Sequence, residues 1–260
     1  MIYLINNKFI TAKKATLPIS SDALRGYGLF ETLRGYNSDE FFMATEHVQR
    51  LLKSAKHIDL KIKFNQNQIL KMMKKIANKN KHKNKVVRIM AVPDKLIITV
   101  DKLIINPKIY EGVKCLSINH MRSLPQIKSI SYLPSLLSHQ KAVKKGYYDA
   151  ILIDDKKQIY EGAYSNIFWF ESNTLCTRKN NVLSGITRQA VLKISPFKIK
   201  YKTISIYQLY KKPEVFLTSS LKNIVPVTKI DNKKIGSGQP GKNTKILISM
   251  LSAHIHSLVG

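Results

Sequence analysis

The sequence predicts a mixed α/β (α+β) protein of two domains, a small N-terminal α/β domain at residues 1–106 and a larger C-terminal domain at residues 113–260. Helix-like and strand-like periodicities occur in both halves of the chain. Residues 107–112, within the run NPKIYEG, have the Pro and Gly content of a linker. A chain of 260 residues can bury a substantial core, in one large domain or in two smaller ones.

The first domain combines strands with two helices. Residues 44–58 (ATEHVQRLLKSAKHI) are predicted to form an amphipathic helix with Thr45 as its N-cap, and residues 66–77 a second helix with a Met-bearing apolar stripe that belongs to the core. Alternating apolar and polar residues predict strands at residues 2–10 (a pair bent at Asn6-Asn7), 29–36, 86–92 and 95–100. The lysine-rich run at residues 74–85 has no interleaved aromatic residues for base stacking, so we interpret it as a solvated helix end and loop.

The second domain has its own pattern of elements. Residues 132–145 predict a helix that stops at Gly146, and AILID and QIYEG predict two strands about a turn at residues 155–157. LSGITRQAVL places a glycine just before a helical run, and EVFLTSSLKNIVPV predicts a buried strand that ends in hydroxyl side chains. GSGQPGKN resembles a P-loop, but Asn243 stands where Ser or Thr would hold magnesium, so a helix-entry turn is predicted there.

Composition excludes several classes of protein. The net charge of +28 can attract nucleic acid or an anionic membrane, but it is spread widely and suggests no specific partner of either kind. Cys115 and Cys176 fit neither a disulfide framework nor a metal-site spacing, and the 7 histidines form no metal-like cluster. The start of the chain lacks the features of a signal peptide, and no run is long enough to cross a bilayer. We therefore expect a cytoplasmic protein without a metal.

Two residues in the stretch from Ile127 to Phe170 carry reactive chemistry. Lys128 lies in the apolar and small-polar run IKSISYL, and Glu161 lies in IYEGAYSNIFWF. A desolvated lysine loses its charge readily and can act as a nucleophile or form a Schiff base. A carboxylate in a low-dielectric site needs a cationic partner, and a protonated pyridine ring would serve. Taken one at a time, the two residues also fit a surface lysine and a strand-end glutamate.

Together with GLFETLR, HVQRL, GIT and TSSLKNIVPV, this stretch resembles the class IV (fold-type IV) pyridoxal-phosphate aminotransferases. That family includes branched-chain and D-amino-acid aminotransferases and aminodeoxychorismate lyase. The resemblance spans nearly the whole chain and implies a β-barrel-like α/β larger domain, a pyridoxal 5'-phosphate cofactor and a homodimer. It places Lys128 where the family forms a Schiff base with the cofactor, and Glu161 where the family pairs with the pyridine nitrogen.

The resemblance also implies which residues hold the cofactor phosphate. Arg50 of HVQRL would bind it, because a guanidinium can grip two phosphate oxygens. The backbone amides of Ile186 and Thr187, at a helix start, and the hydroxyl of Ser220 would complete the phosphate site.

Other residues are assigned to the ring and to the substrate by the same resemblance. Tyr132 would bond the cofactor's phenolic oxygen, and Asn166 would support the strand of Glu161. Arg88 fits either a substrate carboxylate or a structural role. The residues implied to face an amino or carboxylate substrate are Tyr27, which replaces the Asp of the usual GDG signature, Thr32, Arg34 and Arg88.

Three functions remain open from the sequence. ETLR, the short spacing from Lys128 to Tyr132 and TSSLKNIVPV favour 4-amino-4-deoxychorismate lyase, which releases pyruvate and forms 4-aminobenzoate for folate synthesis. The alternative is an amino-acid aminotransferase, of D-amino-acid or branched-chain type, which moves an amino group to a 2-oxo acid. The shortened loop after Val92 weakens both assignments, because that loop shapes specificity in the family. A basic nucleic-acid-binding protein without catalysis is a third class, and it would bind no cofactor.

Overall fold

The structure is a computed structural model that describes residues 2–16, 21–37 and 39–259. Its contacts divide the chain into two compact units. The first unit comprises Met1–Ile104, Ile127–Ser131 and Leu258–Gly260, and the second comprises Ile105–Gln126 and Tyr132–Ser257. Residues 107–112, predicted as a linker, form the 3-10 helix η2 (Pro107–Glu111) near the start of the second unit.

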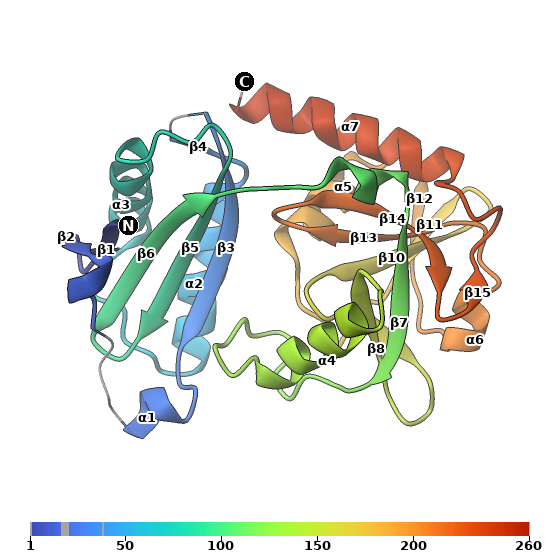
Figure 1. Ribbon diagram of the computed structural model, residues 1–260, viewed down its shortest axis with the longest axis horizontal. Coiled ribbons are helices and arrows are strands. Elements are labelled where there is room, and N and C mark those ends of the chain that lie inside the picture. The colour runs from blue at the N-terminus through green and yellow to red at the C-terminus, as the bar shows by residue number, and fades with distance from the viewer. Residues whose placement is uncertain (1, 17–20, 38, 260) are drawn as a thin grey trace. The chain divides into compact units, whose positions relative to one another are not determined.

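The first unit is built on a six-stranded sheet with the order β2-β1-β6-β5-β3-β4 (Figure 1). All its strand pairs are antiparallel. Its hairpins turn where the sequence predicts them, since Asn6 and Asn7 both have positive φ, as a tight type I′-like bend requires. The strands are β1 (Ile2–Ile5), β2 (Lys8–Thr11), β3 (Leu29–Tyr36), β4 (Glu40–Phe41), β5 (Lys85–Val92) and β6 (Lys95–Lys102).

Two helices, α2 (Ala44–His57) and α3 (Gln66–Asn78), cover one face of this sheet (Figure 1). The apolar stripes of both helices are buried against β3, β5 and β6, which confirms the predicted core. Asn65 caps α3 through a reciprocal capping box with Gln68. The prediction of Thr45 as the N-cap of α2 is wrong, because the helix already includes Ala44 and Met43 enters it in a left-handed conformation. The short elements of this unit are η1 (Ala12–Lys14) and α1 (Ser21–Leu24).

The segment Ile127–Ser131 belongs to the first unit, although the chain on either side of it belongs to the second. Its backbone lies beside the start of β3: Phe30 donates its N–H to the Lys128 carbonyl (2.9 Å), and Ile130 donates to Gly28 (3.0 Å). Ser129 forms an antiparallel bridge with Leu29. Gly28 allows this approach, because a Cβ there would lie 2.8 Å from the Ile130 side chain and 2.9 Å from the Ala91 carbonyl oxygen.

The second unit is built on a nine-stranded, curled sheet of mixed direction (Figure 1). Its order is β12-β11-β10-β13-β14-β7-β8-β9, with β15 paired to β14, and the pairs β11–β12, β14–β7 and β7–β8 are parallel. The strands are β7 (Val113–Asn119), β8 (Asp149–Ile153), β9 (Ile159–Gly162), β10 (Asn166–Glu171), β11 (Thr174–Thr177), β12 (Lys198–Tyr201), β13 (Val215–Ser219), β14 (Asn223–Ile230) and β15 (Lys233–Lys234).

Helix α4 packs on β7 and β8 of this sheet through small residues. It buries Ser135, Ser138 and Ala142, and its polar side includes His139. The chain leaves the helix at Gly146, which has a φ of 76° and so ends it as predicted. The helices of the second unit are α4 (Leu133–Lys144), α5 (Ile186–Ile194), α6 (Ile206–Leu209) and α7 (Lys242–Val259).

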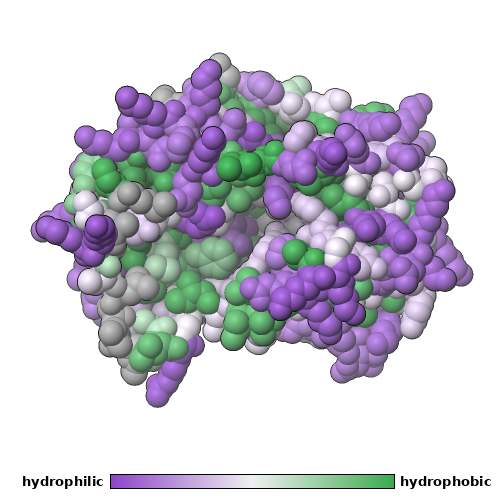
Figure 2. Space-filling model, in the orientation of Figure 1, coloured by the Kyte–Doolittle hydropathy of each residue, from purple (hydrophilic) through white to green (hydrophobic). Residues whose placement is uncertain are grey.

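The lysines of the run at residues 74–85 are exposed, as the sequence predicts, except for Lys85. Figure 2 shows hydrophilic residues distributed over the viewed face among apolar ones. Lys85, at the end of the lysine-rich run predicted to be solvated, is instead 1% exposed and donates to the Asn37 carbonyl. Burial lowers the pKa of Lys85. In the described part of the chain, no helix is both long and apolar enough to span a membrane.

Candidate active site

Lys128 is held in the first unit by the backbone pairing of its segment with β3. Its Nζ lies 4.3 Å from the centre of the Phe30 ring, and its side chain is half-buried. An aromatic face attracts an ammonium group while withholding the water that would otherwise solvate it. The sequence placed Lys128 in an apolar setting, and Phe30 supplies the apolar surface.

Arg50 lies on α2 and is fixed by a buried carboxylate. Its Nε donates to Glu31 Oε1 (2.7 Å) and its second terminal nitrogen to Glu31 Oε2 (2.8 Å). His47 Nδ1 also contacts Glu31 Oε2 (2.7 Å), and Glu31 and His47 are each 1% exposed. Burial by itself would raise the pKa of Glu31, but the charges of Arg50 and His47 and their hydrogen bonds lower it to about 2. The Glu31 carboxylate therefore stays ionised and sets the orientation of the Arg50 guanidinium.

Burial lowers the pKa of His47, although Glu31 acts in the opposite direction. The positive charges of Arg50 and Lys128 lower the pKa of His47 further. Glu31, Arg50 and Lys128 are therefore all close enough to His47 in the first unit to affect its charge. Glu31 was missed as a site residue from the sequence. A signal was available, because alternation along ETLR places Glu31 on the buried face of β3, where a carboxylate needs a cation.

Three of the predicted substrate residues lie on the face of the first sheet opposite α2 and α3. Thr32 on β3 is directly opposite Arg88 on β5, and Arg34 is two residues further along β3. Each arginine already has a polar partner: Arg34 donates to Asn84 Oδ1 (2.9 Å), and Arg88 is paired with Asp101 (2.6 Å). These contacts leave the substrate role of the three residues a prediction.

Tyr27, the fourth predicted substrate residue, has a structural contact. Its hydroxyl donates to the Ile58 carbonyl (2.6 Å), and its ring packs against the core of the first unit. A substrate role would require that hydrogen bond to be exchanged.

Glu161 is the second-last residue of β9 in the second unit and is 4% exposed. Its Oε2 accepts from the Leu183 N–H (3.0 Å) and from Asn166 Nδ2 (3.1 Å), and its Oε1 accepts from Arg122 (3.2 Å). All three groups are donors, and an ionised carboxylate, which only accepts hydrogen bonds, can satisfy each of them. The sequence predicts a pyridine ring as the cation that this buried acid needs, but it does not indicate Arg122, which supplies a cation from the protein.

Asn166 contacts the Glu161 carboxylate, and Tyr132 contacts the backbone just after Glu161. The Asn166 amide donates to both Glu161 Oε2 (3.1 Å) and the Leu183 carbonyl (2.8 Å). The Tyr132 hydroxyl donates to the carbonyl of Ala163 (2.5 Å), two residues after Glu161, and the Arg122 guanidinium lies 5.4 Å from the centre of its ring. Burial raises the pKa of Tyr132, so the phenol stays protonated at neutral pH.

The start of α5 faces the Asn166 side chain. Gly185 is its N-cap and makes no side-chain capping bond, so the first-turn amides of Ile186 and Thr187 are not capped by that residue. A Cβ at Gly185 would lie 2.0 Å from Asn166 Oδ1, which makes glycine necessary for this approach. Asn166 is also paired in register with Thr218 on β13.

The hydroxyl side chains at the end of β13 and in the turn that follows lie beside Asn166. Ser220, the predicted phosphate ligand, follows Ser219 in the turn between β13 and β14. Within the described ranges, the buried Oγ1 of Thr218 has no hydrogen-bond partner. An uncapped helix start close to an unpaired hydroxyl suits an anionic group.

Arg188, one residue after Thr187, is a second cation near Glu161. It is 6% exposed and donates to the Arg178 carbonyl (2.9 Å). Burial lowers the pKa of Arg188, while Tyr201 and Glu161 act in the opposite direction. The sequence offered no signal for Arg122 or Arg188, because both act through contacts with distant parts of the chain.

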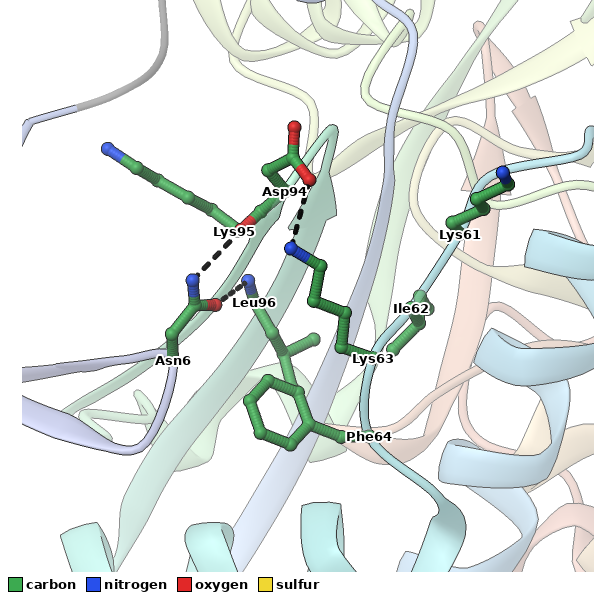
Figure 3. A pocket seen from close by; sticks show the side chains of 8 residues that line it. All are labelled: Asn6, Lys61, Ile62, Lys63, Phe64, Asp94, Lys95 and Leu96. Atoms are coloured by element: carbon green, nitrogen blue, oxygen red, sulfur yellow. Dashed lines mark hydrogen bonds and ion pairs between the residues drawn. The ribbon is translucent and has the colours of Figure 1, made fainter.

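Two other features are structural. A small pocket in the first unit contains the Asn6 amide, which donates to the Asp94 carbonyl and accepts from the Leu96 N–H (both 2.9 Å), so it ties two hairpin turns together (Figure 3). None of the predicted site residues lines it; its lining is Asn6, Lys61, Ile62, Lys63, Phe64, Asp94, Lys95 and Leu96.

The P-loop-like run leads into α7, as predicted. The Glu214 carboxylate accepts from the Asn243 N–H (3.1 Å), the Thr244 N–H (2.7 Å) and the Thr244 hydroxyl (2.6 Å). This protein carboxylate occupies the place that a phosphate would take at a helix start. Among the described residues, no cluster of His, Cys, Asp and Glu could hold a metal ion.

Comparison with known proteins identifies the family. The sequence model of the family described as "Amino-transferase class IV" matches residues 28–230, so the chain belongs to the class IV aminotransferases. The D-alanine aminotransferase of Bacillus licheniformis is 29% identical over 282 residues, covering 99% of this chain and 98% of that protein. A Methanocaldococcus jannaschii protein, provisionally named a branched-chain-amino-acid aminotransferase, is 29% identical over 271 residues, covering 95% of this chain and 93% of that protein.

A solved structure has the same fold. The Escherichia coli branched-chain amino acid aminotransferase superimposes with a TM-score of 0.91 over 100% of this chain and 96% of that chain, at 24% identity. This likeness confirms the mixed α/β fold class. The names of the sequence relatives support the predicted aminotransferase alternative better than the lyase.

Proposed function

We propose that this protein is an amino-acid aminotransferase of the D-amino-acid or branched-chain type. Membership in class IV makes it a pyridoxal-phosphate-dependent enzyme. The observation that carries the site assignment is the buried Glu161 carboxylate, which is held by Arg122, Asn166 and the Leu183 amide. A carboxylate fixed in this way can accept a hydrogen bond from a protonated ring nitrogen without first reorganising.

The residues present fit the cofactor. The uncapped start of α5, the unpaired Thr218 hydroxyl and the close approach at Gly185 suit the phosphate, with Ile186, Thr187 and Ser220 as ligands. In the first unit, Glu31 orients the guanidinium of Arg50, which the sequence resemblance assigns to a phosphate. When bound, pyridoxal phosphate supplies an electron sink for negative charge at the substrate α carbon.

Lys128 would provide the amine that bonds the cofactor aldehyde and, once displaced by the substrate amine, would move the proton at the α carbon. The Phe30 ring, whose centre lies 4.3 Å from Nζ, places the Lys128 side chain beside an apolar surface, and both roles need its amine as the free base. Arg34 and Arg88 would bind substrate carboxylate groups, each exchanging its present partner.

The lyase remains a second candidate because of ETLR, the short spacing between Lys128 and Tyr132, and TSSLKNIVPV. Its product would be 4-aminobenzoate, formed with release of pyruvate. Purified enzyme should be assayed with D-alanine or L-leucine as amino donor and 2-oxoglutarate as acceptor, and separately with aminodeoxychorismate. Amino transfer without pyruvate release from aminodeoxychorismate supports the aminotransferase, and the reverse pattern supports the lyase.

The cofactor assignment has a test of its own. The purified protein should show a visible absorbance band that borohydride bleaches, with the reduced label on Lys128 in a peptide map. The variant Lys128→Ala should show no such label, and Lys145→Ala, which changes an exposed lysine, should behave as the wild type. A label on any other lysine would overturn the assignment.

We also propose that the protein is a cytoplasmic homodimer. Light scattering during size-exclusion chromatography would test its oligomeric state.

A further inference from the structure

The turn that joins Glu161 to Asn166 is anchored from several directions. Within the turn, the Gly162 N–H donates to the Ser165 carbonyl (2.7 Å). The Ala163 N–H donates to the Ala150 carbonyl (2.9 Å), and the Ala163 carbonyl accepts from Tyr132 (2.5 Å). Since the two residues at the ends of the turn hydrogen-bond each other, any movement of the turn changes where the Glu161 carboxylate points.

Asp149 anchors the far end of this turn. Its side chain is buried, with Oδ2 accepting from the Ser165 hydroxyl (3.0 Å) and Oδ1 accepting from the Ala150 N–H (2.8 Å). Glycine at position 162 permits this packing, because a Cβ there would lie 2.0 Å from Ser165 Oγ and 3.0 Å from Asp149 Oδ2. Asp149 lies on β8 and the turn follows β9, so the carboxylate ties the turn to the neighbouring strand.

His139 on α4 completes the chain of contacts. Its Nδ1 lies 3.0 Å from Asp149 Oδ1, and its ring centre lies 4.4 Å from that of Tyr164, within the turn. Tyr164 in turn stacks on Tyr132 at 5.6 Å. A carboxylate oxygen accepts hydrogen bonds, so we assign Nδ1 as the donor. One imidazole therefore contacts both the anchor of the turn and a side chain of the turn.

We propose that His139 and Asp149 are positioning residues for Glu161. They fix the turn of residues 162–165, and through it the direction in which the Glu161 carboxylate meets the ring nitrogen of the cofactor. This inference rests on the proposed function, in which Glu161 contacts that nitrogen. The contacts of His139 do not include Glu161 itself, so its influence has to pass through the turn.

The test is a double-mutant cycle between His139→Leu and Glu161→Gln. The readout is cofactor affinity, followed by quenching of the chain's 1 tryptophan, Trp169, which lies on β10 three residues after Asn166. His139→Leu should weaken affinity about tenfold in the wild-type background and much less in the Glu161→Gln background, because groups acting through one another are not additive. His139→Asn, whose amide can still donate to Asp149, should restore affinity to within about twofold of wild type.

The neighbouring exposed residue provides the control, and Gln140→Leu should bind cofactor as the wild type does. Circular dichroism and thermal unfolding of each variant report whether it folds; if His139→Leu does not fold, the comparison of His139→Asn with His139→Ala replaces it. Equal weakening by His139→Leu in both backgrounds would overturn the positioning role. If Glu161→Gln alone leaves cofactor affinity unchanged, the assigned role of Glu161 in the proposed function fails, which is a separate result.

Discussion

Replacing Glu31 with glutamine should destabilise the protein in a pH-dependent way. Glu31 has its pKa lowered from 4.5 to about 2, because Arg50 and His47 outweigh the opposing effect of burial. This difference corresponds to about 3 kcal/mol of folding free energy at neutral pH. A folded-state pKa below the unfolded value means that the contribution is present above pH 4.5 and is lost as the pH falls through about 2. Near pH 3.5, roughly 2 kcal/mol should remain.

Urea unfolding of the wild type and of Glu31→Gln, followed by circular dichroism, measures this contribution at each pH. The free energies should differ by about 3 kcal/mol at pH 7, because the variant leaves the Arg50 guanidinium beside a neutral amide. The control Glu46→Gln changes a less buried acid on α2 and should cost at most about 1 kcal/mol. A difference between the wild type and Glu31→Gln that does not shrink between pH 7 and pH 3.5 would refute the reasoning.

Three further predictions concern the second unit. Arg122→Met should destabilise the protein by about 3 kcal/mol in urea unfolding, since Glu161 loses its ion pair; an unchanged midpoint would contradict this. Gly185→Ala should weaken cofactor binding about tenfold in a fluorescence titration, because its Cβ would lie 2.0 Å from Asn166 Oδ1, whereas Gly146→Ala, with nothing within 4 Å, should leave binding unchanged. Glu214→Ala should lower the free energy of unfolding by about 1–2 kcal/mol, because the start of α7 loses its acceptor, and a neutral result would show that water replaces it.

Most of the fold follows from local sequence. The alternation of residues 29–36 appears as β3, with every second side chain buried, and the apolar stripes of α2 and α3 form the core of the first unit. These patterns act over a few residues, so one sequence is enough to find them. The N-cap of α2 and the burial of Lys85 were predicted wrongly, because a capping preference at Thr45 and a charged run were each overridden by the packing around them.

The candidate site was only partly predictable for the same reason. The sequence proposed Lys128, Arg50 and Glu161, but it did not supply the groups that hold them. Arg122 is 39 residues from Glu161 along the chain, and Glu31 is 19 residues from Arg50, so these pairings exist only once the sheets have formed. Whether the predicted site residues share one cofactor is still a prediction, as are the residue ranges given for the two domains.

The placement of Ile127–Ser131 beside β3 has a consequence for biosynthesis. The first 104 residues leave the ribosome well before residues 127–131, which provide the backbone partners of Gly28 and Phe30. A nascent chain halted before residue 127 would therefore carry an unfinished sheet edge and no Lys128. A fragment truncated at residue 104 should expose that edge. A single truncation therefore cannot produce the complete first unit.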